Sequence, residues 1–299
     1  MEEIRKRALG AYLGLAIGDA LGATVEFMTP REIRHQYGVH KEITGGGWLK
    51  LDAGEVTDDT EMSLALGRAI LQSAGWDGQA AAEAFVSWLK TKPADVGNTC
   101  RRGIRRFMAD GTLSGPVSES DGGNGAAMRI LPVVISTLHD DESLHEQIVA
   151  QCHLTHNHPL SDAASTALGS MARKLILGGG MKDCRKIVNG LVEKHPKFGF
   201  NPYPGRASGY IVDTMQTVLF HFFHTDSFES CLIETVNRGE DADTTGAIAG
   251  MLAGALYGLD AIPDRWLKRI DPGVSAEIRL QVEGLLGLGG QKAPAQPFG

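Results

Sequence analysis

The stretch from residue 239 to 257 constrains the fold of this chain most, because it joins an acidic, hydroxyl-rich segment directly to a long run of small apolar residues. Asp241, Asp243 and Thr244 stand just before that run of Ala, Gly, Leu and Met. Such a run is suited to a buried helix, so the acids fall at the start of the helix. The sequence therefore places hard oxygen ligands at the edge of the core.

A second segment of the same kind lies much earlier, where Thr57, Asp58 and Asp59 precede an apolar run that begins at Met62. One Asp or Thr at a helix start is usually an N-cap, and its charge suits the helix dipole. A cap uses a single side chain, however, whereas each segment carries two carboxylates with flanking hydroxyls. We interpret the two segments as halves of one site.

Bringing the two pairs of carboxylates together would be costly without a counter-charge. Four carboxylates within ~5 Å of one another would repel by roughly 3 kcal/mol per pair at an effective dielectric constant of about 20. The sum over all pairs would far exceed the free energy of unfolding of a typical domain. Convergence would therefore require bound cations, and carboxylate and hydroxyl oxygens favour Mg, Mn or Ca over Zn or Cu.

Composition limits the classes of protein that remain. The chain has 299 residues, 42% of them hydrophobic, which is enough for a full core. Its net charge of −7 argues against general nucleic-acid binding. Four scattered cysteines without C-x-x-C spacing fit free thiols in a reducing cytosol. Residues 5–17 resemble a signal peptide, but two preceding glutamates spoil its basic start, and we expect a soluble cytoplasmic protein without direct membrane insertion.

Apolar spacing predicts an all-α fold, with almost no strand signal. We expect one compact multi-helix domain over residues 1–290 and a disordered tail at 291–299. After a buried N-terminal helix, helices are expected at roughly 60–73, 79–91, 99–109, 126–138, 142–153, 160–177, 183–194, 208–224, 228–237, 244–258 and 274–286. The catalytic and binding residues would then lie in loops at the helix ends.

Three further polar segments lie between the two acidic ones. Residues 93–99 join two helices, and Asn98 either caps the second helix or faces a site. Residues 121–129 form a glycine-rich loop whose backbone N–H groups can bind an anion such as pyrophosphate, although it matches no established phosphate motif. Residues 153–158 contain three histidines, which more often cap a helix or contact a ligand than hold zinc.

A dense basic patch begins just after Asn98 and consists of Arg101, Arg102, Arg105 and Arg106. Such a patch is usually a solvated helix face. Beside the mouth of an active site on an acidic protein, it could also steer a negatively charged protein substrate.

Taken together, these segments resemble the ADP-ribosylglycohydrolase family, in the family's order and over essentially the whole chain. The resemblance rests on residues 18–22 (GDALG), 57–60 (TDDT), 123–129 (GNGAAMR), 155–159 (THNHP) and 241–246 (DADTTG). It implies an all-α domain with a two-metal cleft that receives ADP-ribose. The chain is most similar to members that act on ADP-ribosylated dinitrogenase reductase, through residues 25–29, 44–49, 95–106 and 210–219.

The resemblance also implies roles for individual residues. Two divalent cations, Mn²⁺ in preference to Mg²⁺, would be held by Thr57, Asp58, Asp59, Asp241, Asp243 and Thr244. The substrate would be bound by Asn98, Gly122, Gly123, Asn124, Gly125, His156 and Tyr210. Of these, the glycine loop would line the pyrophosphate, His156 would contact ADP-ribose near its phosphates, and Tyr210 would face the adenine unless it lies on an ordinary core helix. Glu240 stands where the family often has Gly, and its role is left open.

The implied reaction is hydrolysis of the N-glycosidic bond between ADP-ribose and an arginine side chain. The leaving guanidine is strongly basic, so it must depart protonated and held. Asp95 is the candidate for that task, because a carboxylate can hold a guanidinium and move a proton. Glu26 is the second candidate, as a general base or a gate over the metals. Which carboxylate does which task is not decided by the sequence.

The implied protein substrate is ADP-ribosylated dinitrogenase reductase, in a nitrogen-fixing bacterium that switches this enzyme off by modification and on by its removal. A nitrogen-signalling regulatory protein is an implied partner, through which the chain could associate with a membrane. Three alternatives stay open: a hydrolase for serine-linked or O-acetyl ADP-ribose, a non-catalytic ADP-ribose-binding relative, and a metal-dependent phosphohydrolase that releases AMP.

Overall fold

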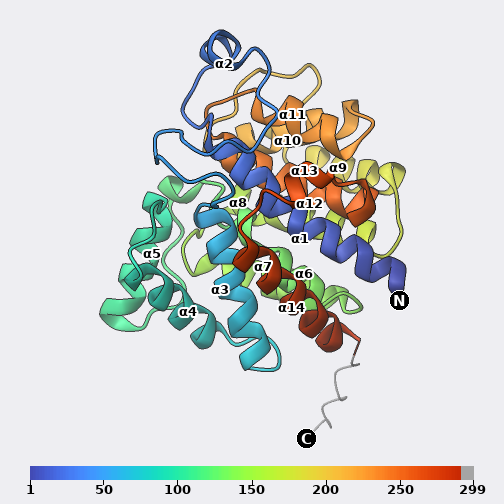
Figure 1. Ribbon diagram of the computed structural model, residues 1–299. Coiled ribbons are helices and arrows are strands. Elements are labelled where there is room, and N and C mark those ends of the chain that lie inside the picture. The colour runs from blue at the N-terminus through green and yellow to red at the C-terminus, as the bar shows by residue number, and fades with distance from the viewer. Residues whose placement is uncertain (291–299) are drawn as a thin grey trace, which may run out of the picture.

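Two helices of small residues form the centre of the molecule in the computed structural model, which describes residues 1–290 (Figure 1). They are α1 (Glu2–Ala23) and α12 (Ala242–Tyr257), which pack antiparallel along most of their lengths. Glycines at every fourth position of each helix face one another, and a Cβ on Gly14 or Gly250 would overlap the carbonyl group opposite. The backbones are therefore in direct contact, which only glycine permits at these positions.

This pairing positions the acidic start of α12. Gly22, near the end of α1, lies against Ala242, the first residue of α12. Residues 242–255 are all buried, as expected of a helix that is apolar all round. The chain leaving α1 therefore passes directly beside Asp241 and Asp243.

The remaining helices surround this pair, with α3, α4 and α5 on one side and α10 and α11 on the other (Figure 1). Their bounds are α2 (Pro30–Tyr37), α3 (Asp58–Gln72), α4 (Gly78–Lys90), α5 (Asn98–Asp110), α6 (Leu131–Ser136), α7 (Asp141–His153), α8 (Pro159–Ile176), α9 (Met181–Lys194), α10 (Ile211–His224), α11 (Phe228–Val236), α13 (Asp264–Leu267) and α14 (Pro272–Gly289). Short 3₁₀ helices lie at Glu119–Asp121, Ala127–Arg129, Pro196–Phe198 and Leu259–Ala261. Residues 1–290 contain no strand, so the expected all-α class is confirmed.

Two expectations for the helices are wrong. The helix expected at 126–138 is divided into a 3₁₀ turn and α6, because Pro132 has no N–H to continue a helix and sits instead in the first turn of α6. No helix was expected between the N-terminal helix and residue 60, but α2 lies there at Pro30–Tyr37. The sequence did carry the signal for this helix, since Thr29 and Glu32 form a capping box around its first turn.

The four cysteines lie within the described part of the chain, and all are buried and unpaired. None of the helices within residues 1–290 combines the length and the apolar character that crossing a bilayer requires. The tail expected at 291–299 lies outside the described residues.

Candidate active site

A cavity of about 860 Å³ opens where the starts of α3, α5 and α12 meet. Most residues singled out in the sequence line it, namely Glu26, Asp58, Asp95, Asn98, Gly123, Asn124, Gly125, His156, Asp241, Asp243 and Thr244. Four of them do not: Thr57 and Asp59 are buried behind Asp58, and Gly122 and Tyr210 lie beside the cavity. One concave surface thus gathers side chains from segments almost 220 residues apart in sequence, from Glu26 to Thr244.

The two acidic segments meet through direct hydrogen bonds. Thr244 Oγ1 donates to Asp59 Oδ2 at 3.2 Å. Thr57 Oγ1 lies 3.3 Å from the same oxygen and 3.5 Å from Asp243 Oδ2. The start of α3 therefore faces the start of α12, with carboxylates and hydroxyls between them.

Glu26 adds a third carboxylate to the α12 side of this cluster. One carboxylate oxygen from each of Glu26, Asp241 and Asp243 lies within 4.8 Å of the other two, which is close enough to share a cation. The other side of Glu26 is fixed by Trp48, whose indole Nε1–H donates to Glu26 Oε2 at 2.5 Å. Glu26 is thus placed to contact whatever binds between the two aspartates.

Asp19 explains why α3 begins where it does. This carboxylate is fully buried in α1 and accepts hydrogen bonds from the backbone N–H groups of Thr57 at 3.0 Å and Thr60 at 3.1 Å, and from the Thr60 hydroxyl at 2.5 Å. A neighbouring helix therefore caps α3, and the Thr57 side chain is free to face the acids. Asp19 had no role predicted from the sequence, although a lone carboxylate inside an apolar run is itself a signal.

The electrostatics of the cluster show a deficit of positive charge. Burial, reinforced by the neighbouring carboxylates, raises the pKa of Asp58 to about 7 and that of Glu26 to about 8. The same causes raise the pKa values of Asp59 and Asp243 well above the ordinary range. Asp59 Oδ1 is buried without a hydrogen-bond partner among the described residues. An unpartnered buried oxygen within an all-oxygen donor set fits a hard divalent cation.

Asp95 and Asn98 approach the cluster from the turn before α5. Gly97 is the N-cap of α5 and no side chain caps that helix, so Asn98 does not act as an ordinary cap. The Gly97 N–H instead donates to Asp58 Oδ2 at 3.0 Å, which ties the turn to the acids. Asp95 is half-buried, and this burial raises the pKa of its carboxyl group.

The glycine-rich loop forms the opposite end of the cavity. It is held against the start of α10 by hydrogen bonds from Ile211 N to Gly122 O at 2.9 Å and from Asn124 N to Gly209 O at 3.1 Å. The Asn124 side chain reaches the acids and donates to Asp241 Oδ2 at 2.6 Å. The loop is therefore fixed relative to the carboxylates.

His156 lies directly against this loop, where a Cβ on Gly125 would stand 3.0 Å from its ring. Its Nδ1 lies 2.7 Å from Thr155 Oγ1, which also accepts a hydrogen bond from Arg129 Nη2 at 2.7 Å. Burial, followed by the charges of Arg129 and Arg102, lowers the pKa of His156 well below its ordinary value. The ring is therefore neutral near pH 7.

The position of the imidazole proton follows from these contacts. The Arg129 guanidinium can only donate, so the hydrogen of the Thr155 hydroxyl has one acceptor within reach among the described residues, His156 Nδ1. The ring hydrogen then sits on Nε2, and a Cβ on Gly123 would stand 3.2 Å from that atom. His156 thus offers an N–H donor beside the glycine loop, suited to an anionic oxygen.

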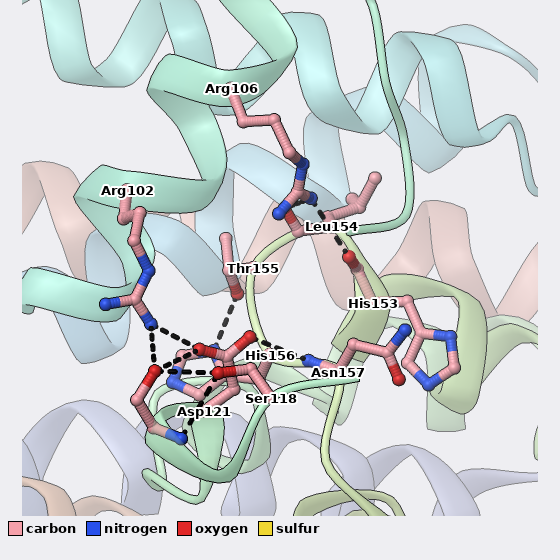
Figure 2. Close-up of polar contacts among 10 residues, drawn as sticks. Arg102, Arg106, Ser118, Asp121, His153, Leu154, Thr155, His156 and Asn157 are labelled. Atoms are coloured by element: carbon pink, nitrogen blue, oxygen red, sulfur yellow. Dashed lines mark hydrogen bonds and ion pairs between the residues drawn. The ribbon is translucent and has the colours of Figure 1, made fainter. Parts of the chain in front are cut away.

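Two arginines of α5 hold the segments around His156 in place (Figure 2). Arg102 pairs with Asp121, whose Oδ2 lies 3.5 Å from the backbone N of Asn157. Arg106 donates to the carbonyl oxygens of His153 at 3.3 Å and Leu154 at 3.0 Å. These two arginines are therefore structural.

The other two arginines of the basic patch, Arg101 and Arg105, are exposed and form no ion pair within residues 1–290. Arg101 also lines the cavity. The basic patch therefore divides into two pairs. Arg102 and Arg106 hold neighbouring segments in place, and Arg101 and Arg105 form a solvated face.

The other two histidines of residues 153–158 contact protein groups and belong to no cluster of three metal-ligating side chains within residues 1–290. His158 caps α8 by accepting from Leu160 N at 3.1 Å, and His153 pairs with Asp162 at 2.9 Å. These contacts agree with the interpretation of the segment as caps and ligand contacts.

Tyr210 and Glu240 also have defined positions. Tyr210 is the N-cap residue of α10 and 39% exposed, so it does not lie on a core helix. Its ring covers Gly122, because a Cβ on Gly122 would lie 3.3 Å from Cε2 of Tyr210. Glu240 accepts a hydrogen bond from Ala207 N at 2.9 Å and so braces the loop that leads to Tyr210.

Comparison with known proteins gives one consistent result. A family model described as ADP-ribosylglycohydrolase matches residues 1–294. The chain is 60% identical over 287 residues to ADP-ribosyl-[dinitrogen reductase] glycohydrolase of Rhodospirillum rubrum, covering 96% of this chain and 98% of that protein. It is 32% identical to ADP-ribosylarginine hydrolase Tri1 of Pseudomonas putida (strain GB-1), and the match covers 90% of this chain and 75% of that protein. A solved ADP-ribosylglycohydrolase-related protein complex matches with a TM-score of 0.86 at 31% identity, covering 97% of this chain and all of that one.

Proposed function

The chain belongs to the ADP-ribosylglycohydrolase family, and we propose that it removes ADP-ribose from a modified arginine of dinitrogenase reductase, thereby reactivating that enzyme in the control of nitrogen fixation. The relative from Rhodospirillum rubrum bears this activity in its name and is similar over nearly the whole chain. One structural observation carries the proposal: the carboxylates at the starts of α3 and α12 converge in a cavity whose far end is a glycine loop.

The carboxylate cluster is proposed to hold two divalent cations, Mn²⁺ in preference to Mg²⁺. The proposed ligands are Thr57, Asp58, Asp59, Asp241, Asp243 and Thr244, with Glu26 within reach. Bound cations would supply Lewis-acid chemistry, orienting the ribose hydroxyls and activating a water molecule. They would also give the unpartnered Asp59 Oδ1 a partner.

The glycine loop is proposed to bind the pyrophosphate of ADP-ribose. Gly123, Asn124 and Gly125 line the cavity with their backbone, and His156 Nε2–H lies beside them as a further donor. Gly122 and Tyr210 lie just outside, where the Tyr210 ring can cover the adenine. Asn98 lines the cavity between this loop and the acids and is proposed as a substrate ligand.

The reaction transfers ADP-ribose from arginine to water. The oxygen of water bonds to the anomeric carbon of the ribose, and the bond from that carbon to the guanidine nitrogen breaks. The bonding pair leaves with the nitrogen, which takes up a proton while the water loses one. We assign Glu26 to accept the proton from water, and Asp95 to protonate and hold the leaving guanidine through charge-assisted hydrogen bonds.

The proposed function is tested by incubating the purified protein with arginine-ADP-ribosylated dinitrogenase reductase, in the presence of Mn²⁺ or a chelator. Mass spectrometry then follows the modified peptide and the released nucleotide. Release of intact ADP-ribose with unmodified arginine, only when metal is present, is the expected result. AMP as the product would indicate a phosphohydrolase instead. ADP-ribose binding without release would indicate a different linkage, tested with serine-linked and O-acetyl ADP-ribose, or a non-catalytic relative.

The predictions about the cell follow from the resemblance alone. They are a cytoplasmic location, a nitrogen-signalling regulatory protein as partner, and membrane association through such a partner. Co-purification from nitrogen-fixing cells, before and after ammonium is added, tests all three.

A further inference from the structure

Two aromatic side chains at the rim of the cavity have no function in the reaction described so far. Phe27 is 67% exposed and Trp48 is 51% exposed, and both line the cavity. Their ring centroids lie 5.3 Å apart with an interplanar angle of 50°. Large rings exposed together at the mouth of a cavity are typical of a surface that a ligand covers.

Phe27 is held in place by a strained backbone. Its φ is 61°, in the left-handed region that a bulky side chain rarely adopts. Two hydrogen bonds fix this conformation, from Phe27 N to Glu240 O at 2.6 Å and from Glu240 N to Met28 O at 2.8 Å. Because Glu240 directly precedes Asp241, the ring is fixed relative to the carboxylate cluster.

Trp48 is held by its polar edge. It lies in the tight turn between Gly46 and Leu51, whose backbones exchange hydrogen bonds of 2.7 and 3.0 Å. The indole N–H is bound to Glu26, so the exposed half of the ring is its apolar surface. A second ligand contact through the N–H is therefore excluded, and any contact made by Trp48 is through its face.

The contacts along the cavity show which part of a substrate meets this pair. At one end Asn124, from the glycine loop, contacts Asp241 at 2.6 Å, and at the other end Trp48 contacts Glu26 at 2.5 Å. Asp241 and Glu26 belong to the same carboxylate cluster. If the nucleotide lies on the glycine loop and the ribose over the cluster, the group bonded to the ribose leaves toward Trp48 and Phe27.

A second cavity, of about 970 Å³, adjoins the first and is separated from it by this aromatic pair. It is lined by Glu26, Phe27 and Trp48 on one side and by residues of α2, among them Arg31 and His35, on the other. A surface therefore continues from the carboxylates, over the two rings, into a polar groove. This shape suits an arginine side chain attached to a polypeptide.

We propose that Phe27 and Trp48 bind the arginine side chain of the protein substrate, with the flanking polypeptide in the groove beside α2. The planar guanidinium and its aliphatic stem can pack on the aromatic faces through cation–π and apolar contact. This inference rests on the proposed function, and it makes the pair a determinant of specificity for the leaving group.

The test measures the affinity of Phe27 variants for two substrates and one product. The substrates are free ADP-ribosylarginine and the modified protein, and the product is ADP-ribose. Phe27→Asn removes the ring while keeping a residue that tolerates a positive φ. We expect the KM of Phe27→Asn to rise about tenfold for free ADP-ribosylarginine, as for loss of one partly desolvated cation–π contact. The rise is expected to be at least as large for the modified protein, and the Kd for ADP-ribose should be unchanged. Phe27→Tyr, which restores a ring, should recover most of the lost affinity.

Two further variants separate binding from other effects. Trp48→Phe keeps an aromatic face but loses the N–H to Glu26, so we expect a lower kcat with little change in KM. Leu280→Ala, a truncation of an equally exposed apolar side chain on α14, is the control and should change neither constant. An unchanged KM for Phe27→Asn, or a parallel rise in the Kd for ADP-ribose, would overturn the inference. If the unaltered protein with Mn²⁺ released no ADP-ribose from either substrate, the proposed function itself would fail.

Discussion

The hydroxyl of Thr155 lies 2.7 Å from Nδ1 of His156 and accepts a hydrogen bond from Arg129, also at 2.7 Å. This hydroxyl favours the proton on Nε2 of His156, because Arg129 has only donors and the hydroxyl hydrogen has no acceptor but Nδ1 among the described residues. A fully buried arginine thus acts on the end of the cavity formed by the glycine loop through one side chain.

Thr155→Val should weaken ADP-ribose binding and lower stability. The substitution keeps the shape of the side chain but removes the donor to Nδ1 and leaves one N–H of Arg129 unpaired. We expect the free energy of unfolding to fall by about 1–3 kcal/mol, measured by urea denaturation, and the Kd for ADP-ribose to rise about tenfold, measured by calorimetry. Thr155→Ser keeps the hydroxyl and should retain the free energy of unfolding and the Kd for ADP-ribose. Equal losses in the two variants would show that the hydroxyl does not have this role.

The stability of the metal-free protein should fall as pH rises. The folded-state pKa values of Asp58, about 7, and Glu26, about 8, lie above their ordinary values near 4. Between about pH 4 and 8 the folded chain therefore binds more protons than the unfolded chain, so the free energy of unfolding decreases with pH. Differential scanning fluorimetry with a chelator should show a lower Tm at pH 8 than at pH 5. Mn²⁺ should raise the Tm more at pH 8, because it competes with protons for the carboxylates.

Asp95→Ala should remove turnover while preserving product binding. Asp95 lines the cavity, but the two acidic segments meet without it, so the metal ligands and the glycine loop stay in place. We expect kcat to fall by about 10²–10⁴-fold, as for loss of a proton-transfer group, with an unchanged Kd for ADP-ribose. Equal loss of turnover and binding would show that Asp95 supports the site instead of acting on the leaving guanidine.

Charge reversal at Arg101 and Arg105 should slow the reaction with the protein substrate. Arg101 lines the cavity, and Arg105 is exposed one turn later on the same face of α5. For Arg101→Glu with Arg105→Glu, kcat/KM should fall about tenfold at low salt, and the difference should shrink at higher salt. Arg279→Glu with Lys186→Glu, at exposed sites on α14 and α9, controls for the same change in net charge. A loss that is independent of salt would argue against steering.

Gly250→Ala should destabilise the whole fold. Its Cβ would overlap the carbonyl oxygen of Gly14 on the facing helix, and backbone cannot move aside as a side chain can. We expect a loss of at least about 1–3 kcal/mol in the free energy of unfolding, measured by denaturation. Gly190→Ala, in the middle of α9 with open space around it, should instead be neutral or stabilising by about 0.5–1 kcal/mol. Similar effects at both sites would refute the role of close packing.

Apolar spacing was enough to predict the all-α class, and residue type was enough to single out the acids at the starts of α3 and α12. A helix cap requires one polar side chain, whereas each segment carries two carboxylates with flanking hydroxyls. This difference can be seen in the sequence alone. The role of Asp19 was not visible, because it depends on α1 lying beside the start of α3. The same holds for Trp48, whose partner Glu26 is brought to it by a turn that local patterns do not specify.

One error and one open alternative arose from rules that compete locally. Pro132 divides a segment whose apolar spacing continues smoothly, and the missing N–H prevails over the spacing. Asn98 is a good capping residue in general, but here a backbone N–H one residue earlier is bound to Asp58, and the side chain faces the cavity instead. In both cases the state of one backbone N–H group, missing at Pro132 and bound to Asp58 before Asn98, outweighs the general preference of the sequence pattern.

The glycine contacts between α1 and α12 also limit how this enzyme can evolve. A helix pair in backbone contact at every fourth residue tolerates neither a larger residue there nor an insertion, since either would displace the acids at its end. The rim is constrained as well, because a Cβ on Gly47 or Gly239 would overlap the carbonyl oxygen of Ala23 or Met28, whereas the far side of the groove is lined by side chains of the peripheral helix α2. Descendants of this chain can therefore change the residues of α2 that face the groove, while the centre that cleaves the glycosidic bond is inherited intact.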